Sequence, residues 1–341
     1  MKTTTLTLLF FAALLSIHAQ NIITVDNTTG SNAQYDNLQS AISAATAGDI
    51  IHVMPSETSY GNVIIEKTLT LIGFAHSDSD KRSVVGSVQL TTGADNTRLT
   101  SLELSDTYNV RYNTVPLTGL IVENCLLEEL YFYNAGADDI LIRGNILNYV
   151  GYGSTSSNYS NAIITNNIIT RQVVVINYQS VSVKNNIFLN PVSSNPVYNR
   201  GYANGSISVQ NNIFYYSTSA TYDPNVDGVT FENCLTYNIG TGNVASLNGN
   251  NNLDNRNPLF LEDNDNATYD PTTDDYNLGA GSPAIDAGVN GEDIGLYDDS
   301  SSFTFNNLGF SNGVPTVRIE AISTTVAPGQ NLNVIISTTN N

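Results

Sequence analysis

The sequence contains few charged residues and very little cysteine or histidine. Only 13% of its 341 residues are charged, and 12 basic residues stand against 31 acidic ones, which gives a formal net charge of -19. Such a charge repels nucleic acid and anionic membranes, so we expect neither as a partner. Three histidines leave little material for a zinc site or a histidine-based catalytic triad.

Long apolar segments are absent apart from one at the N-terminus. The run over residues 6–17 follows Lys2 and ends shortly before Ala19, a small residue ahead of Gln20. It is too short to span a bilayer, and the pattern is typical of a cleaved secretory signal. We therefore interpret residues 1–19 as a signal peptide and expect an exported protein, secreted or at the cell surface, without a transmembrane segment.

A short phrase related to Ile-x-Val-x-Asn-Asn-Ile recurs along the chain at intervals of roughly twenty residues. One key position in each copy falls at residues 74, 102, 125, 145, 167, 186, 212 and 234, with steps of 28, 23, 20, 22, 19, 26 and 22. One short β phrase per repeat of this period is typical of a solenoid. Because no single copy can bury its apolar face alone, the copies must stack.

The alternation of side chains along a strand predicts which residues of each phrase face the interior. The apolar members are expected to point inward: Val122, Ile142, Ile164, Val183, Val209 and Phe231. The residues that follow them are then expected to point outward: Glu123, Arg143, Thr165, Lys184, Gln210 and Glu232.

Asparagine at the key position needs hydrogen-bonding partners inside the stack. A side-chain amide has donors and an acceptor, so Asn145, Asn167, Asn186 and Asn212 are expected to bond along the stack and to nearby backbone. Asparagine also tolerates the left-handed backbone that a sharp corner requires. We predict a structural ladder without a catalytic role.

The only two cysteines, Cys125 and Cys234, occupy the same key position five repeats apart. With strands about 4.8 Å apart, their sulfurs would lie on the order of 24 Å from each other. A disulfide needs Cα atoms within about 7 Å. We therefore predict two buried free thiols, one at each end of the asparagine ladder.

The segments before and after the repeats have different patterns. A strand at 22–25 and a short amphipathic helix, starting near a capping box at 36–39, precede strands at 50–54, 62–65 and 68–71. Near the C-terminus, strands at 316–322 and 332–337 flank Ala327-Pro328-Gly329. We expect the helix to close one end of the stack and the terminal hairpin to close the other.

Three segments resemble a known family. The N-terminal cap of right-handed parallel β-helix proteins of the pectin-lyase-like superfamily is similar to Tyr35-Asp36-Asn37-Leu38-Gln39-Ser40-Ala41-Ile42, Ala47-Gly48-Asp49-Ile50-Ile51 and Leu69-Thr70-Leu71-Ile72-Gly73. The closing segment of many secreted members resembles residues 257–293, with Ser282-Pro283-Ala284-Ile285-Asp286-Ala287-Gly288. The resemblance, which covers residues 21 to 300 with the repeats, implies an all-β right-handed parallel β-helix with an N-terminal amphipathic cap helix and a C-terminal β-hairpin cap.

This fold divides the chain into a signal peptide (1–19), an N-terminal cap with the first coils (20–75), a parallel β-helix (76–256), a closing segment (257–300) and a C-terminal β-hairpin (301–341). The superfamily contains polysaccharide lyases, hydrolases, epimerases, tailspikes, adhesins and members without known activity. A shared fold therefore does not carry shared chemistry. The sequence contains no catalytic motif of the family, no glycine-rich phosphate loop and no serine nucleophile elbow.

One outward column contains candidate catalytic residues for a uronate lyase, which needs a base and a cation that stabilises the developing charge. Arg143 and Lys184 are two rungs and roughly 10 Å apart, with Thr165 between them as a candidate substrate contact. The alternative is structural: Glu123 forms a surface ion pair with Arg143, and Lys184 is solvated. The negative net charge also argues against a polyanionic substrate.

Two further groups are weighed against simple structural roles. Asp138 and Asp139 form a weak candidate for a hydrolase pair, since adjacent strand residues face opposite sides. Tyrosines follow many strand phrases, and their flat faces suit sugar rings. We select Tyr149 and Tyr178 as candidate substrate contacts, although packing over neighbouring rungs is the interpretation we favour for tyrosines of this kind.

An acidic run at 263–275 supplies the hard oxygen ligands that calcium prefers. Asp263, Asp265 and Asp270 are the candidate ligands, but the run lacks the glycine and terminal glutamate of an EF-hand loop. We favour a plain acidic loop over a weak calcium site. Calcium is the one cofactor that the sequence suggests.

The sequence leads to two hypotheses of different classes. The first is an exported, monomeric protein that binds or acts on an extracellular polysaccharide, lyase-like if it is catalytic. The second is a non-catalytic structural or adhesion scaffold at the cell surface.

Overall fold

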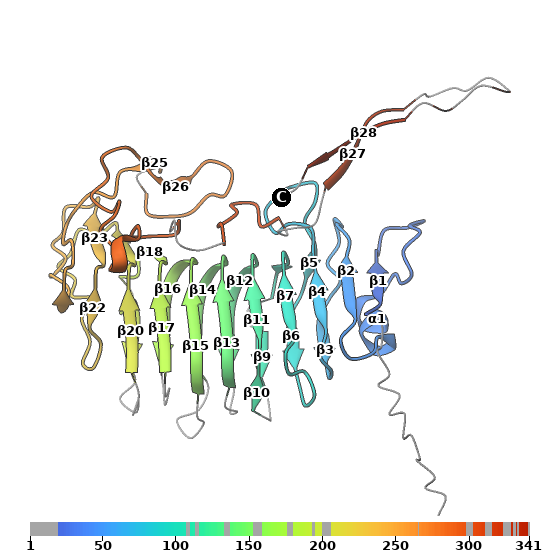
Figure 1. Ribbon diagram of the computed structural model, residues 1–341, viewed down its shortest axis with the longest axis horizontal. Helices are drawn as coiled ribbons and strands as arrows, with labels where there is room; N and C mark the ends of the chain where they lie inside the picture. Colours follow the sequence, from blue (N-terminus) through green and yellow to red (C-terminus); the bar gives the residue numbers. More distant parts are fainter. Residues whose placement is uncertain are drawn as a thin grey trace, which may run out of the picture.

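The computed structural model describes residues 20–106, 110–112, 116–132, 137–152, 159–175, 180–192, 195–199, 206–264, 266–297, 303–310, 316–322, 329, 332 and 334–339. Most of them form a parallel β-solenoid, whose strands run across the long axis of the molecule and stack along it (Figure 1). The predicted all-β solenoid is therefore confirmed. The predicted signal peptide lies outside the described residues.

Two 12-stranded sheets with parallel strand pairing form the body of the solenoid. The strands of the first sheet are β1 (Ile22–Val25), β2 (Ile50–Val53), β4 (Thr70–Ile72), β7 (Arg98–Thr100), β10 (Leu117–Thr118), β11 (Ile121–Glu123), β13 (Ala137–Arg143), β15 (Tyr159–Thr165), β17 (Ser180–Lys184), β20 (Ser206–Gln210), β22 (Phe231–Glu232) and β24 (Gly249–Asn250). Those of the second are β3 (Val63–Ile65), β5 (Val84–Val85), β6 (Val88–Leu90), β8 (Glu103–Leu104), β9 (Val110–Tyr112), β12 (Leu126–Phe132), β14 (Ile146–Tyr152), β16 (Ile168–Val175), β18 (Ile187–Leu189), β19 (Val197–Asn199), β21 (Ile213–Tyr216) and β23 (Leu235–Asn238).

The register of the first sheet reproduces the predicted repeat. From Leu71 to Phe231, each inward residue pairs with a residue 28, 23, 20, 22, 19, 26 or 22 positions further along, in the predicted order. The stack also continues beyond the predicted copies, because Ile51 pairs with Ile23 and Leu71, and Phe231 pairs with Gly249. All six residues predicted to face inward are buried.

The predicted asparagine ladder is present at the corner between the two sheets. Each Nδ2 donates to the Oδ1 of the next member, at 3.0 Å from Asn145 to Asn167, 2.9 Å from Asn167 to Asn186 and 3.0 Å from Asn186 to Asn212. Each Nδ2 also donates to backbone carbonyls, as Asn167 does to Ile142 and Thr165. These bonds satisfy amides that are fully buried, which would otherwise be costly.

The structure corrects one part of the ladder prediction. The left-handed backbone belongs to the residue before each ladder member, with positive φ at Asn124, Gly144, Asn166, Asn185, Asn211 and Asn233. In each Asn-Asn pair, the first residue therefore adopts the left-handed backbone of the corner, and the side chain of the second residue forms the buried hydrogen bonds of the ladder. The residue that adopts the strained conformation points outward, where its side chain meets a different part of the chain.

Both cysteines are buried and unpaired, as predicted. Burial raises the pKa of the Cys125 and Cys234 thiols to about 12. The backbone N–H of Cys125 donates to Asn145, but that of Cys234 donates to Oδ1 of Asn252 at 3.0 Å. Cys234 is therefore an internal member of the ladder, which continues for one more rung.

Helix α1 (Leu38–Ala44) packs beside the first strands at the N-terminal end of the stack (Figure 1). It buries Leu38, Ala41 and Ile42. The N-cap is Asn37, whose side chain accepts from the backbone N–H of Ser40, so the predicted pairing of residues 36 and 39 does not form the cap. Gln39 instead bonds the backbone of Ile64, in β3, through both its oxygen and its nitrogen.

The chain beyond the last rungs folds back along the outside of the solenoid. It contains β25 (Phe260–Glu262), β26 (Asp275–Leu278) and the short 3-10 helix η1 (Val289–Gly291). We call residues 284–297 and 303–310 the return segment. Its apolar side chains form a second core against the outward isoleucines of the second sheet, with the members Ile168, Ile187, Ile213, Ala284, Ile294, Leu296 and Phe305.

The outward corner asparagines hold the return segment in place. Asn233 donates to the carbonyl of Ala287, Asn185 to those of Asp293 and Gly295, and Asn166 to that of Leu296. Further along, the backbone N–H of His76 donates to the carbonyl of Leu308 at 3.0 Å. The segment therefore runs from the last rungs back to the first ones.

The C-terminal strand pair forms as predicted but is not placed over the far end of the stack. Strands β27 (Thr316–Ile322) and β28 (Val334–Thr339) are antiparallel. Figure 1 shows them projecting from the solenoid near β4 and β5, because the return segment carries the chain back to the first coils. No helix among the described residues is long and apolar enough to cross a membrane.

Candidate functional site

The predicted catalytic column is in register but is largely covered. Arg143, Thr165 and Lys184 lie on three adjacent strands, as the repeat predicts. Thr165 is buried, and the guanidinium of Arg143 lies 4.8 Å from the ring centre of Phe303 in the return segment. The return segment thus lies beside Arg143 and Thr165, in the space where a substrate would have to bind.

Glu123 is buried between two arginines, and this places Arg143 in a structural role. The Nε of Arg143 donates to Oε2 of Glu123 at 2.9 Å, and the Nε of Arg98 donates to Oε1 at 2.7 Å. The predicted pair of Glu123 and Arg143 therefore exists, but Glu123 is only 2% exposed rather than a surface residue. A buried carboxylate needs such partners, since an unpaired one would be strongly destabilising.

A second region of the same coils places polar groups together on the outer face of the second sheet, where β12, β14 and β16 lie side by side (Figure 1). In a regular strand one outward residue separates two inward ones. In β12, two outward residues separate the buried Leu127 and Leu130. The pairing of β14 with β16 also shifts register after Leu147. Such bulges re-aim side chains and are frequent next to binding sites.

The extra residues on these three strands contact one another across the sheet. We call Glu128, Glu129, Asn148, Tyr149, Thr170 and Arg171 the bulge cluster. Asn148 donates through Nδ2 to Glu128 and accepts at Oδ1 from the hydroxyl of Thr170. Arg171 Nη1 lies 3.6 Å from Glu129 Oε1. The cluster therefore forms two polar rows that cross the three strands.

The aromatic member of the cluster is Tyr149, one of the predicted substrate contacts. Its ring lies against the backbone of Gly151 and beneath the guanidinium of Arg171, which is 5.3 Å from the ring centre. Tyr131 lies beside it, with ring centres 6.4 Å apart. Tyr149 is only 8% exposed, because Arg171, Tyr131 and the backbone of Gly151 surround its ring.

Glu129 is partly buried and lies between groups of opposite charge. Burial raises the pKa of Glu129, Arg171 lowers it, and neighbouring Glu128 raises it, with a net upward shift. Half of the Arg171 side chain is exposed, so it can reach a ligand. Carboxylates, an amide, a hydroxyl, a guanidinium and an aromatic ring together suit the hydroxyls and apolar faces of sugars.

The other sequence candidates have different surroundings. Asp139 adopts a left-handed backbone in β13, and the carboxylate of neighbouring Asp138 accepts from Ser160 and Asn161. Beside them lies a shallow groove of about 420 Å³ that includes the partly exposed Leu141 and Ile163. Tyr178 lies outside the described residues.

The acidic run is used for local structure where the structure describes it. Asp263 accepts from the hydroxyl of Tyr215 at 2.6 Å, and Asp270 accepts from the backbone and hydroxyl of Thr272. Asp265 lies outside the described residues. In the described parts of the chain, no three histidine, cysteine or acidic side chains are grouped as a metal site requires. Calcium binding by the run stays a prediction.

A signal for the bulge cluster is present in the sequence but weak. Glu128 and Glu129 stand together inside Leu126-Leu127-Glu128-Glu129-Leu130, which breaks strict alternation. The repeated isoleucine after each Asn-Asn pair is a stronger signal for the return segment. An apolar outward column requires something to cover it.

Comparison with models of known protein families gives no match for this sequence. Comparison with curated proteins gives no match either.

Proposed function

We propose that this protein binds an extracellular polysaccharide through the bulge cluster on the outer face of the second sheet. The observation that carries the proposal is the coincidence of the bulges on β12, β14 and β16, which brings six sugar-compatible side chains together. Structural bulges alone would not require these side chains. Each row in the cluster contains a carboxylate and at least one uncharged partner.

The expected ligand is neutral rather than acidic. The one cation of the cluster, Arg171, already lies beside Glu129, and a second carboxylate, that of Glu128, adds negative charge. The whole chain has a formal charge of -19, which would repel a polyanion. A neutral glycan can instead donate its hydroxyls to the two carboxylates and pack an apolar face near Tyr149.

Export, right-handed winding and a relation to the pectin-lyase-like superfamily belong to the same proposal. They are supported by the N-terminal apolar run and by the cap and closing segments noted in the sequence. Binding is favoured over lyase chemistry, because Arg143 is engaged by the buried Glu123 and by Phe303. A cation in this arrangement stabilises the fold and is not held ready for a substrate.

Titration with a panel of neutral and acidic polysaccharides, with and without calcium, tests the proposal. Binding is followed by calorimetry and unsaturated product by absorbance. The double variant Glu128→Gln/Arg171→Gln should weaken binding of a neutral glycan by roughly tenfold or more. The matched control is Glu262→Gln/Arg256→Gln, which changes the same types of exposed residue away from the cluster.

Three outcomes distinguish the hypotheses. Equal loss in both double variants would contradict a site at the bulge cluster. Unsaturated product that disappears in Lys184→Ala would establish the lyase alternative. Absence of binding to every glycan would favour the scaffold, whose supporting observation is the continuous hydrogen-bonded corner held under the return segment.

A further inference from the structure

The C-terminal strand pair exposes a group of large apolar side chains. We call β27, β28 and Leu332 the C-terminal arm. The exposed fractions are 55% for Leu332, 42% for Val334, 61% for Ile335 and 58% for Ile336. Successive residues of a strand point to opposite faces of the sheet, so exposure of three in a row means that both faces of β28 are uncovered. Exposed apolar side chains that gather in this way mark an interaction surface.

The arm is a smaller sheet than water normally supports. Among the described residues, β27 and β28 pair only with each other, as a sheet of two strands. Figure 1 shows that they project away from the solenoid. An isolated two-stranded sheet is marginally stable, and three or more strands are needed for independent stability. We infer that a second copy of this chain supplies the missing strands, by pairing its own β28 with β28 of the first copy.

The composition of the two strands indicates which edge pairs. Proteins commonly protect an exposed strand edge with charged residues or proline. The sequence of β27 contains Arg318 and Glu320, whereas β28 consists only of valine, isoleucine, serine and threonine. β-branched residues pack well against neighbours on an adjacent strand. The edge of β28 is therefore open to pairing, and the charged β27 strands end the sheet on both sides.

The charge distribution favours a second copy over a charged partner. Residues 301–341 contain one basic residue, Arg318, and one acidic residue, Glu320. Because these cancel, residues 1–300 carry the whole formal net charge of -19. A cationic partner would be attracted to the acidic solenoid rather than to the neutral arm. The projecting arm can meet its own copy while the two acidic solenoids stay apart.

Twofold symmetry allows identical edges to pair. In an antiparallel arrangement each copy uses the same residues, and the contact closes at two chains. Val334, Ile335 and Ile336 of one copy then lie beside β-branched side chains of the other. Part of their apolar surface is removed from water, which stabilises the dimer.

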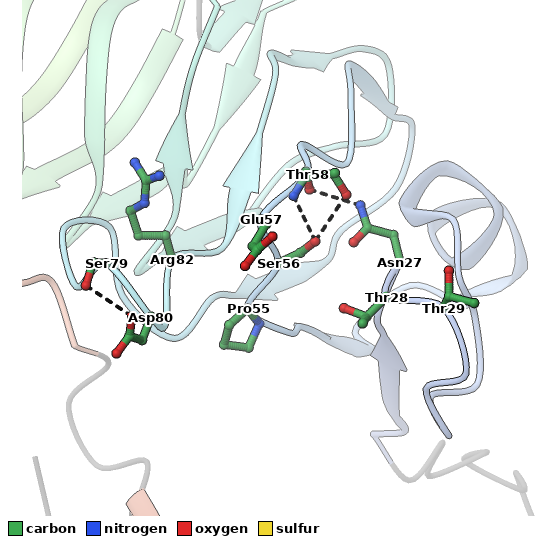
Figure 2. Close-up of a pocket in the computed structure, with 10 residues that line it drawn as sticks. All are labelled: Asn27, Thr28, Thr29, Pro55, Ser56, Glu57, Thr58, Ser79, Asp80 and Arg82. Carbon is green, nitrogen blue, oxygen red and sulfur yellow. Dashed lines mark hydrogen bonds between the residues drawn. The ribbon is translucent and has the colours of Figure 1, made fainter.

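The N-terminal end of the solenoid is a poor surface for such a contact. A hollow of about 600 Å³ at this end is lined mainly by polar side chains, and Glu57 and Asp80 are among them (Figure 2). Two copies that met there would bring like charges together, which is unfavourable. Self-association is therefore expected at the arm.

Sedimentation equilibrium of the purified protein between about 1 μM and about 1 mM tests the inference. The wild type should show an equilibrium between monomer and dimer. Ile335→Lys places a charge in β28 and should weaken dimerisation at least roughly tenfold. The matched control Ile163→Lys makes the same change at an isoleucine of β15 that is 45% exposed, and it should leave dimerisation unchanged.

Salt dependence and hydrogen exchange locate the contact. Salt screens the repulsion between the acidic solenoids, so dimerisation should strengthen as the salt concentration rises. Backbone N–H groups of β28 should exchange more slowly at high protein concentration, because pairing gives them hydrogen-bond partners on the other copy. In Ile335→Lys, exchange at β28 should not depend on protein concentration.

Several results would overturn the inference. A wild type that stays monomeric over the whole range has no such interface, and equal weakening in both variants would show a general charge effect. Protection that rises only outside β28, or association that weakens with salt, would indicate a different interface. Oligomers that keep growing would contradict closure at two chains. Thermal unfolding of both variants shows whether a loss reflects misfolding, and a folded Ile335→Lys variant that dimerises like the wild type also contradicts the assignment.

Discussion

The ring of Tyr149 lies directly against the backbone of Gly151, two residues further along the same strand. A Cβ atom on Gly151 would lie 2.1 Å from the tyrosine ring. Glycine at this position is therefore what allows Tyr149 to lie flat beneath Arg171. The orientation of the one aromatic side chain in the bulge cluster depends on the absence of a side chain at its neighbour.

Replacement of Gly151 by alanine should displace Tyr149. We expect a loss of about 1–3 kcal/mol in the free energy of unfolding, as for other overpacked sites, measured by urea denaturation. In the double variant Tyr149→Ala/Gly151→Ala the clash is gone, so the two effects should not be additive. Simple additivity would contradict the contact as the cause.

The middle of the asparagine ladder should be more sensitive than its end. Asn167→Ala removes the acceptor for Asn145 and leaves buried polar groups unpaired, so it should cost about 2–4 kcal/mol in unfolding free energy. Asn252→Ala affects a partly exposed rung and should cost clearly less. Equal costs at the two positions would argue against a ladder that depends on burial.

The corner asparagines combine a backbone role with a side-chain role, and two substitutions separate them. Asn185 has φ of 54° and donates to the carbonyls of Asp293 and Gly295. Asn185→Gly keeps the left-handed conformation but loses both bonds, whereas Asn185→Ala also introduces strain of about 1–2 kcal/mol. We expect the alanine variant to be the less stable one by that difference.

Proteolysis reports the side-chain role separately. Both Asn185 variants should expose the return segment to limited proteolysis more than the wild type does, because the same two hydrogen bonds are missing. Protection equal to that of the wild type in both variants would mean that the apolar contacts alone hold the segment.

Acid should weaken the contact between the return segment and the first coils. His76 is fully buried, its Nε2 has no partner among the described residues, and Gly309 packs against its ring. Burial lowers the pKa of His76 from 6.5 to about 3. The folded state therefore favours neutral histidine, and stability is full above pH 6.5 and lost as the pH falls towards about 3.

The loss attributable to His76 is on the order of 5 kcal/mol at the acid limit. Urea denaturation of the wild type and of His76→Asn, at several values between pH 7 and pH 4, measures it. The carboxylates that titrate over the same range are common to both proteins and cancel in the comparison. Identical pH dependence in the two would contradict the role of His76.

The parts of the fold that depend on local repetition could be predicted from the sequence. The spacing of the inward residues set the register from Leu71 to Phe231, since a shift by one residue would expose every apolar side chain. The same register placed the asparagines in a single file and kept Cys125 and Cys234 apart. Each of these inferences depends only on the spacing between neighbouring repeats.

The candidate site was predicted less well, because it depends on departures from the repeat. Arg143 and Thr165 occupy the predicted column, but a segment more than a hundred positions further along the chain lies over them. The bulge cluster arises where alternation fails, and a single pair of glutamates is too weak a signal to locate it. Tyr149 was selected as one of many tyrosines, without its relation to Gly151 or Arg171.

The sequence by itself determined a stacked parallel β-solenoid, its register and its buried ladder, because the same pattern of inward and outward residues recurs about every twenty residues. Only the tertiary structure decided which outward faces stay open. That depends on where the return segment lies, and its contacts, such as Asn185 with Gly295 across 110 positions, join residues that share no local pattern. Side-chain alternation tells which residues point outward, and only the folded chain tells what covers them.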